Sequence, residues 1–109
     1  MKIKKFLLIL IFSFLFNTQT SFADEAKMTK GLEIFNEIAG CAACHVLKAA
    51  GSEGNIGPDL DTVEGLNYDS VMDIVTHGLG VMPAFGEDEI LTKEEIDVVS
   101  FYVANSVGK

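Results

Sequence analysis

Residues 41–45 of the 109-residue chain read Cys41-Ala42-Ala43-Cys44-His45, a stretch that contains both cysteines and one of the two histidines. A disulfide between cysteines three positions apart would close only a very small loop. Such a loop removes little chain entropy from the unfolded state, so it would stabilise the fold weakly. A chain of this size forms a marginal core and needs some other support.

The order C-x-x-C-H is the pattern of covalent c-type haem attachment. Two thiols add across the two vinyl groups of one porphyrin, and the two intervening residues let both sulfurs reach the same edge. The adjacent imidazole then falls beneath the iron. The sequence therefore predicts one covalent haem on Cys41 and Cys44, with His45 as an iron ligand.

Three other interpretations of the two cysteines fit less well. A thioredoxin-like dithiol would need a βαβ pattern around it and has no use for the histidine that follows. A zinc site of Cys41, Cys44, His45 and His77 would lack the separated ligand pairs of zinc ribbons and fingers. An inert pair would leave the small core without additional support.

The N-terminus has the pattern of a secretory signal. Lysines at positions 2, 4 and 5 precede an apolar run from Phe6 to Phe16 that is broken only by Ser13. This run is shorter than the about 20 residues of a membrane-spanning helix, and small residues near Ala23 offer a cleavage site. We predict a signal peptide over residues 1–23, export to the periplasm, and one domain over residues 24–109. An uncleaved N-terminal anchor is the alternative.

The chain is acidic, with 16 Asp and Glu against 8 Lys and Arg, and all eight basic residues are lysines. Cleavage after Ala23 would remove three of them, so the remaining 86 residues would carry a formal charge of −11 rather than −8. This charge disfavours nucleic acid, which needs a basic surface. It favours a redox partner with a basic docking surface. A charge that only keeps an exported protein soluble is the alternative.

Apolar spacing predicts helices over residues 26–39, 68–77 and 92–107, with long Gly-containing loops over 49–65 and 79–91. Asn67 or Asp69 can cap the second helix, and a capping box from Thr92 to Glu95 opens the third. No stretch alternates as a β-strand does. The residues expected to face the core are Met28, Leu32, Phe35 and Ile38 or Ala39 on the first helix, Val71, Ile74 and Val75 on the second, and Ile96, Val99, Phe101, Tyr102, Val103 and Val107 on the third.

The order of these elements resembles the class I cytochrome c family, in particular its small monohaem bacterial members, from about Gly31 to Val103. The resemblance implies an all-α class I cytochrome c fold, with three to four short helices and long loops around one covalent haem. Gly31 and Phe35 match the family's first helix and Tyr102 its last, at the point where the two helices cross. Phe35 lies six positions before Cys41, slightly farther than is usual in the family.

The resemblance also implies the residues around the haem. The segment from Asn55 to Leu60 matches the family's loop after the haem motif, in which the Pro58 carbonyl accepts a hydrogen bond from His45 and Leu60 packs on the porphyrin. The Gly-rich turn before Pro83 matches its distal loop, which makes Met82 the sixth ligand. His77 is the alternative ligand, although its place at a helix end also suits a cation. Met28 and Met72 are expected to pack in the core.

Two protein ligands would leave the iron without an open position, so we predict an electron carrier rather than an enzyme. The carrier would exist as a monomer or in weak complexes, and would move single electrons between a dehydrogenase or membrane complex and an acceptor such as a terminal oxidase. A haem subunit of a dehydrogenase that oxidises, for example, sulfite or an alcohol is one alternative. A haem enzyme such as a peroxidase is another.

Overall fold

The computed structural model describes residues 22–109, so the predicted signal peptide lies almost entirely outside the described residues. Residues 22–33 form an α-helix. The elements that follow are η1 (Ile34–Ile38), η2 (Cys41–Ala43), β1 (Val46–Leu47), η3 (Lys48–Ala50), β2 (Ser52–Glu53), α2 (Tyr68–His77) and α3 (Lys93–Ser106). Within residues 22–109, no helix is both long and apolar enough to cross a bilayer.

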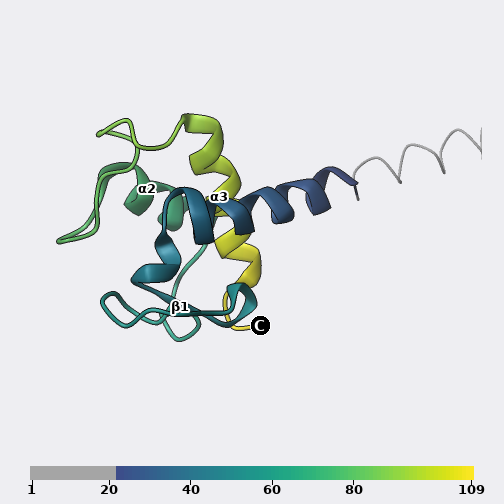
Figure 1. Ribbon diagram of the computed structural model, residues 1–109, viewed down its shortest axis with the longest axis horizontal. Coiled ribbons are helices and arrows are strands. Elements are labelled where there is room, and N and C mark those ends of the chain that lie inside the picture. Colours follow the sequence, from purple (N-terminus) through teal and green to yellow (C-terminus); the bar gives the residue numbers. More distant parts are fainter. Residues whose placement is uncertain (1–21) are drawn as a thin grey trace, which may run out of the picture.

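The N-terminal helix crosses α3, and α2 packs beside α3 (Figure 1). At the crossing, the ring of Phe35 lies 6.1 Å from that of Tyr102, at an interplanar angle of 57°. Gly31 faces the same tyrosine, and a Cβ atom added to Gly31 would overlap Tyr102 and lie 3.1 Å from the carbonyl oxygen of Val98. The missing side chain therefore allows the two helices to approach closely.

We expect Gly31→Ala to destabilise the protein by about 2–3 kcal/mol, because the added methyl group forces the two helices apart. For a domain of this size, that loss lowers the Tm by roughly 10–20 °C. Thermal unfolding followed by circular dichroism measures the change. Lys30→Ala on the same helix is the control, because it removes only an exposed ion pair to Glu33. A Tm of Gly31→Ala within a few degrees of the parent would contradict this account of the crossing.

The N-terminal helix ends in a π-turn, η1, in which the Ala39 N–H donates to the carbonyl of Ile34 at 2.8 Å. A π-turn holds one more residue than an α-helical turn. This extra residue accounts for the long spacing from Phe35 to Cys41, since Phe35 still reaches the helix crossing.

The predicted apolar stripe of the first helix is wrong at Leu32, and of the two alternatives at its end the structure packs Ala39 rather than Ile38 against the core. Leu32 and Ile38 are 36% and 42% exposed, whereas Ile34, which the prediction left out, is fully buried. The crossing is centred on Gly31, so positions 31, 34 and 35 face inward. The π-turn then rotates Ile38 away from the core.

The helices α2 and α3 begin directly after Asn67 and Thr92, two of the capping residues predicted from the sequence. The Asn67 side chain accepts from the N–H of Ser70, and the Ser70 hydroxyl accepts from the N–H of Asn67, both at 3.0 Å. Thr92 and Glu95 form the same reciprocal pair.

The buried core consists of Ile34, Phe35, Leu47, Val71, Val75, Phe85, Leu91, Ile96, Val99, Tyr102 and Val103.

The prediction of a loop over residues 49–65 is wrong at its start. The strands β1 and β2 pair antiparallel, with Val46 opposite Glu53 and Leu47 opposite Ser52. The buried hydroxyl of Ser52 accepts from the N–H of Leu47 at 2.9 Å. Strands of two residues are too short to show an alternating pattern, so the sequence carried no signal for them.

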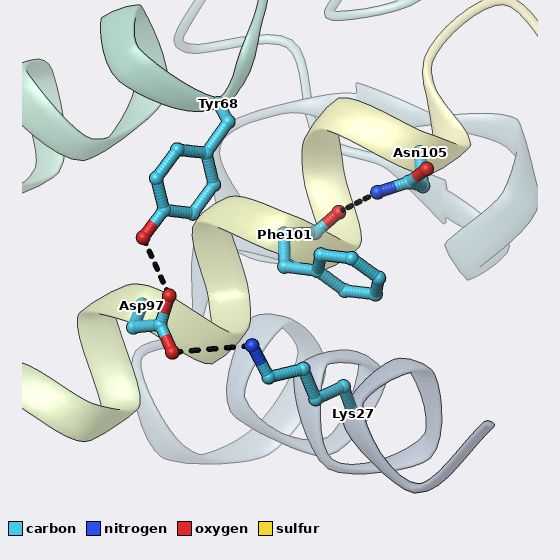
Figure 2. A network of polar contacts seen from close by, with 5 residues as sticks. All are labelled: Lys27, Tyr68, Asp97, Phe101 and Asn105. Carbon is cyan, nitrogen blue, oxygen red and sulfur yellow. Dashed lines mark hydrogen bonds and ion pairs between the residues drawn. The ribbon is translucent and has the colours of Figure 1, made fainter. Parts of the chain in front are cut away.

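One carboxylate links all three helices (Figure 2). Asp97 on α3 accepts a hydrogen bond from the Tyr68 hydroxyl on α2 at 2.5 Å, and pairs with Lys27 of the N-terminal helix at 3.3 Å. The hydrogen bond raises the pKa of Tyr68 to about 12 and lowers the pKa of Asp97. Lys27 also lies 5.1 Å from the ring centre of Phe101. The ion pair is partly exposed, so it contributes at most about 1 kcal/mol.

Candidate haem site

The two cysteines lie on one tight turn that opens at Gly40, which has φ of 71°. The carbonyl of Cys41 accepts from the N–H groups of Cys44 and His45 at 3.1 and 3.0 Å. Both thiols are free and half-buried. Burial raises the pKa of the Cys41 thiol to about 11, whereas dithiol oxidoreductases lower the pKa of the attacking thiol. The turn therefore lacks the activated Cys41 thiolate that disulfide exchange would require.

His45 is oriented by the loop that follows the small sheet. Its Nδ1 lies 2.7 Å from the carbonyl oxygen of Pro58, the contact predicted from the sequence. A carbonyl accepts, so Nδ1 carries the proton and Nε2 is the nitrogen left to bind a metal.

Gly57 belongs to this site, and the sequence reasoning did not single it out. A Cβ atom at position 57 would lie 2.5 Å from Cε1 of His45, so the backbone packs directly against the imidazole ring. The N–H of Gly57 donates to the carbonyl of Cys44 at 2.7 Å, and the N–H of Leu60 donates to that of Val46 at 3.0 Å. The glycine immediately before the predicted Pro58 was the signal that could have found it.

Asp61 anchors the end of this loop. Its carboxylate accepts from the N–H groups of Lys48 and Gly108, at 2.8 and 2.9 Å. These two hydrogen bonds lower the pKa of Asp61 and keep it charged. The segment that presents Pro58 is thereby tied both to the end of β1 and to the C-terminus.

Met82 lies on a tight turn that starts at Leu79. The backbone N–H groups of these two residues each donate to the other's carbonyl, at 3.0 and 3.3 Å. Gly80, at φ of 59°, provides the turn between them. Met82 packs against the core but is only half-buried.

Several apolar side chains at the edge of the core share this half-buried state. They are Cys41, Leu60, Leu66, Met72 and Met82. Met72 is therefore at the edge of the core rather than inside it. Two thiols on one turn, an imidazole with a free Nε2 and several half-buried apolar side chains are the groups that a flat, apolar porphyrin needs, so the residues present suit a haem. When bound, the haem supplies an iron that cycles between Fe(II) and Fe(III).

The structure places His77 on the surface, at the end of α2. Its Nδ1 lies 2.6 Å from the carboxylate of Glu87, and its Nε2 lies 3.6 Å from that of Asp73. Both ring nitrogens therefore face carboxylates. In the described part of the chain, no group of three or more His, Cys, Asp or Glu side chains is arranged to hold a metal ion.

The fold and the C-x-x-C-H site together define a class I c-type cytochrome. The family model described as cytochrome c oxidase, cbb3-type, subunit III matches residues 26–103, and the chain belongs to this family of c-type cytochrome domains. Its cofactor is covalent haem c, held by the Cys41–Cys44 motif. The protein is an electron carrier rather than an enzyme.

Individual relatives agree with this assignment. The chain is 34% identical to cytochrome c6 of Gloeothece citriformis (strain PCC 7424), covering 82% of this chain and 78% of that protein. It is 33% identical to the Cbb3-type cytochrome c oxidase subunit CcoP of Azospirillum sp. (strain B510), covering 75% of this chain but only 31% of that subunit. The crystal structure of the c-type cytochrome SorU from Sinorhizobium meliloti superposes with a TM-score of 0.70 at 44% identity. It covers 78% of this chain and 95% of SorU.

Proposed function

We propose that the protein is a periplasmic one-electron carrier with His45 and Met82 as the axial ligands of its haem. The contact between Nδ1 of His45 and the Pro58 carbonyl carries this proposal, because it prepares Nε2 for iron. Met82 is the proposed second ligand because its thioether is half-buried against the same core as Cys41 and Leu60, on a tight turn between Leu79 and Pro83. Leu60 and the other apolar side chains there exclude water, and this burial together with thioether ligation raises the reduction potential.

We propose that its partners are redox proteins that present a basic surface. The residues after the predicted cleavage site carry a formal charge of −11 and include no arginine. Complementary charge speeds the encounter, while a small interface lets the partners separate after electron transfer. These features suit a carrier that serves a dehydrogenase or membrane complex on one side and an acceptor such as a terminal oxidase on the other.

We expect the rate of electron transfer to such a partner to fall steeply with ionic strength. Between about 10 and 150 mM salt, the Debye length shrinks from roughly 30 to 8 Å, which screens attraction between the two surfaces. Stopped-flow mixing of the reduced protein with a basic, oxidised acceptor measures the association rate. The same protein mixed with an acidic acceptor is the control, and its rate should rise with salt. A rate that stays flat with the basic acceptor would contradict electrostatic steering.

A second candidate function is a haem subunit that stays bound to a larger oxidoreductase, such as a dehydrogenase for sulfite or an alcohol. The similarity to CcoP favours it, because CcoP is itself a subunit of an oxidase. Gel filtration of the native extract separates the two candidates. A free carrier elutes at the size of a small monomer, whereas a subunit elutes together with a larger catalytic chain.

A further inference from the structure

His77 lies at one end of the loop that carries Met82. We define the Met82 loop as residues 78–84. Its two ends are joined by backbone hydrogen bonds, in which the N–H groups of Gly86 and Glu87 both donate to the carbonyl of Thr76. The side chains of His77 and Glu87 meet at 2.6 Å beside these bonds, so one side-chain contact bridges the two ends of the loop.

The backbone next to His77 packs against the backbone of Met82. Gly78 follows His77 directly, and a Cβ atom at Gly78 would lie 2.8 Å from the carbonyl oxygen of Met82. His77 and Met82 also line the same open surface hollow, together with Asp88. The backbone at the His77 end of the loop is therefore in contact with the backbone of the proposed ligand.

We propose that the His77–Glu87 contact positions Met82 for the iron, and that loss of the positive charge on His77 loosens the Met82 loop. This inference rests on the proposed His/Met ligation. His77 and Glu87 are positioning residues, since both side chains face each other and the solvent. The rate at which Met82 leaves the iron would therefore depend on pH.

The charges around His77 set the direction of the pH effect. Asp73 on α2, and Glu87 and Asp88 beyond the loop, are the acidic groups near the ring. The hydrogen bond to Glu87, followed by the charges of Glu87 and Asp73, raises the pKa of His77 above its ordinary value of 6.5. The contact is therefore complete below pH 6.5 and weakens as the pH rises through the higher pKa of the folded protein. A neutral imidazole can still donate to Glu87, so the contact weakens rather than disappears.

The test measures how fast Met82 leaves the iron in the oxidised holoprotein. Cyanide at saturating concentration binds at the rate at which the sixth ligand departs. In the parent protein, this rate should increase about two- to fivefold as the pH rises through the titration of His77, the size expected for an exposed charged contact. Glu87→Gln and His77→Gln should show the faster rate at every pH and no dependence on pH in this range.

Asp73→Asn is the matched control. Asp73 also lies near His77, but on the same helix, so it does not bridge the loop. This variant should keep the parent rate at low pH and retain the pH dependence. If Asp73→Asn accelerates binding as much as Glu87→Gln does, a general charge effect replaces the bridge and the inference is overturned.

The sulfur-to-iron charge-transfer band of the oxidised protein tests the His/Met ligation separately from the positioning role of His77 and Glu87. If the native protein lacks this band, His/Met ligation is wrong and this inference falls with it. If the band is present but Glu87→Gln leaves the cyanide rate and its pH dependence unchanged, only the positioning role of His77 and Glu87 is wrong.

Discussion

Replacing Cys41 and Cys44 together by alanine should leave a chain with little stable tertiary structure. Much of the apolar surface at the edge of the core, including Leu60, Leu66 and Met82, is only half-buried by protein. Without an attached haem, this surface faces water, and a domain of this size has little other burial to offset the loss. The variant should show a weak near-ultraviolet circular dichroism signal and no cooperative thermal transition.

Ala43→Ser is the control for the cysteine variant, because it lies in the same turn and keeps both thiols. It should bind haem and unfold as the parent does. The expectation is refuted if the haem-free variant unfolds cooperatively with an enthalpy near the roughly 60 kcal/mol of a domain this size. In that case, the protein core would suffice without the cofactor.

Met82→Ala should abolish the weak long-wavelength sulfur-to-iron charge-transfer band of the oxidised protein. It should also lower the reduction potential by a substantial share of the roughly 0.8 V that axial ligands control, since thioether sulfur favours Fe(II). Absorbance spectroscopy and a redox titration measure the two changes. Met28→Ala is a matched control, because Met28 packs against the core from the N-terminal helix.

His77→Ala distinguishes the two candidate sixth ligands. With Met82 as ligand, this variant leaves the band in place and the potential nearly unchanged. With His77 as ligand, the native protein would lack the band, and His77→Ala would convert a low-spin haem to a high-spin haem. The iron would then have two histidine ligands, and His77 would replace Met82 in the site.

The local signals in the sequence predicted α2 and α3 well. The caps at Asn67 and Thr92 satisfy backbone N–H groups of the first turn, which is a short-range effect that neighbouring residues decide. The predicted inward residues Val99, Tyr102 and Val103 are buried, because the rest of the fold covers one continuous face of α3. The apolar pattern and the packing agree at these positions, whereas Ile74 and Phe101, which were also expected to face the core, are only partly buried and lie outside the core cluster.

The first helix shows where such local reasoning fails. A stripe drawn through apolar residues gives no weight to Gly31, because glycine has no side chain to count. The close crossing with Tyr102 nevertheless selects the face that contains this glycine, and Ile34 becomes buried in place of Leu32. The π-turn that follows is likewise a response to packing, because it lets Phe35 meet Tyr102 despite its distance from Cys41.

The residues of the haem site divide in the same way. By itself, the sequence determined the attachment turn from Cys41 to His45, because covalent chemistry requires those residue types at that spacing. Only the tertiary structure brought Gly57 against the His45 ring, tied Asp61 to the C-terminus and joined His77 to Glu87. These contacts link residues 10 to 47 positions apart in the chain. Their partners are chosen by how the helices and loops pack, which a local pattern does not encode.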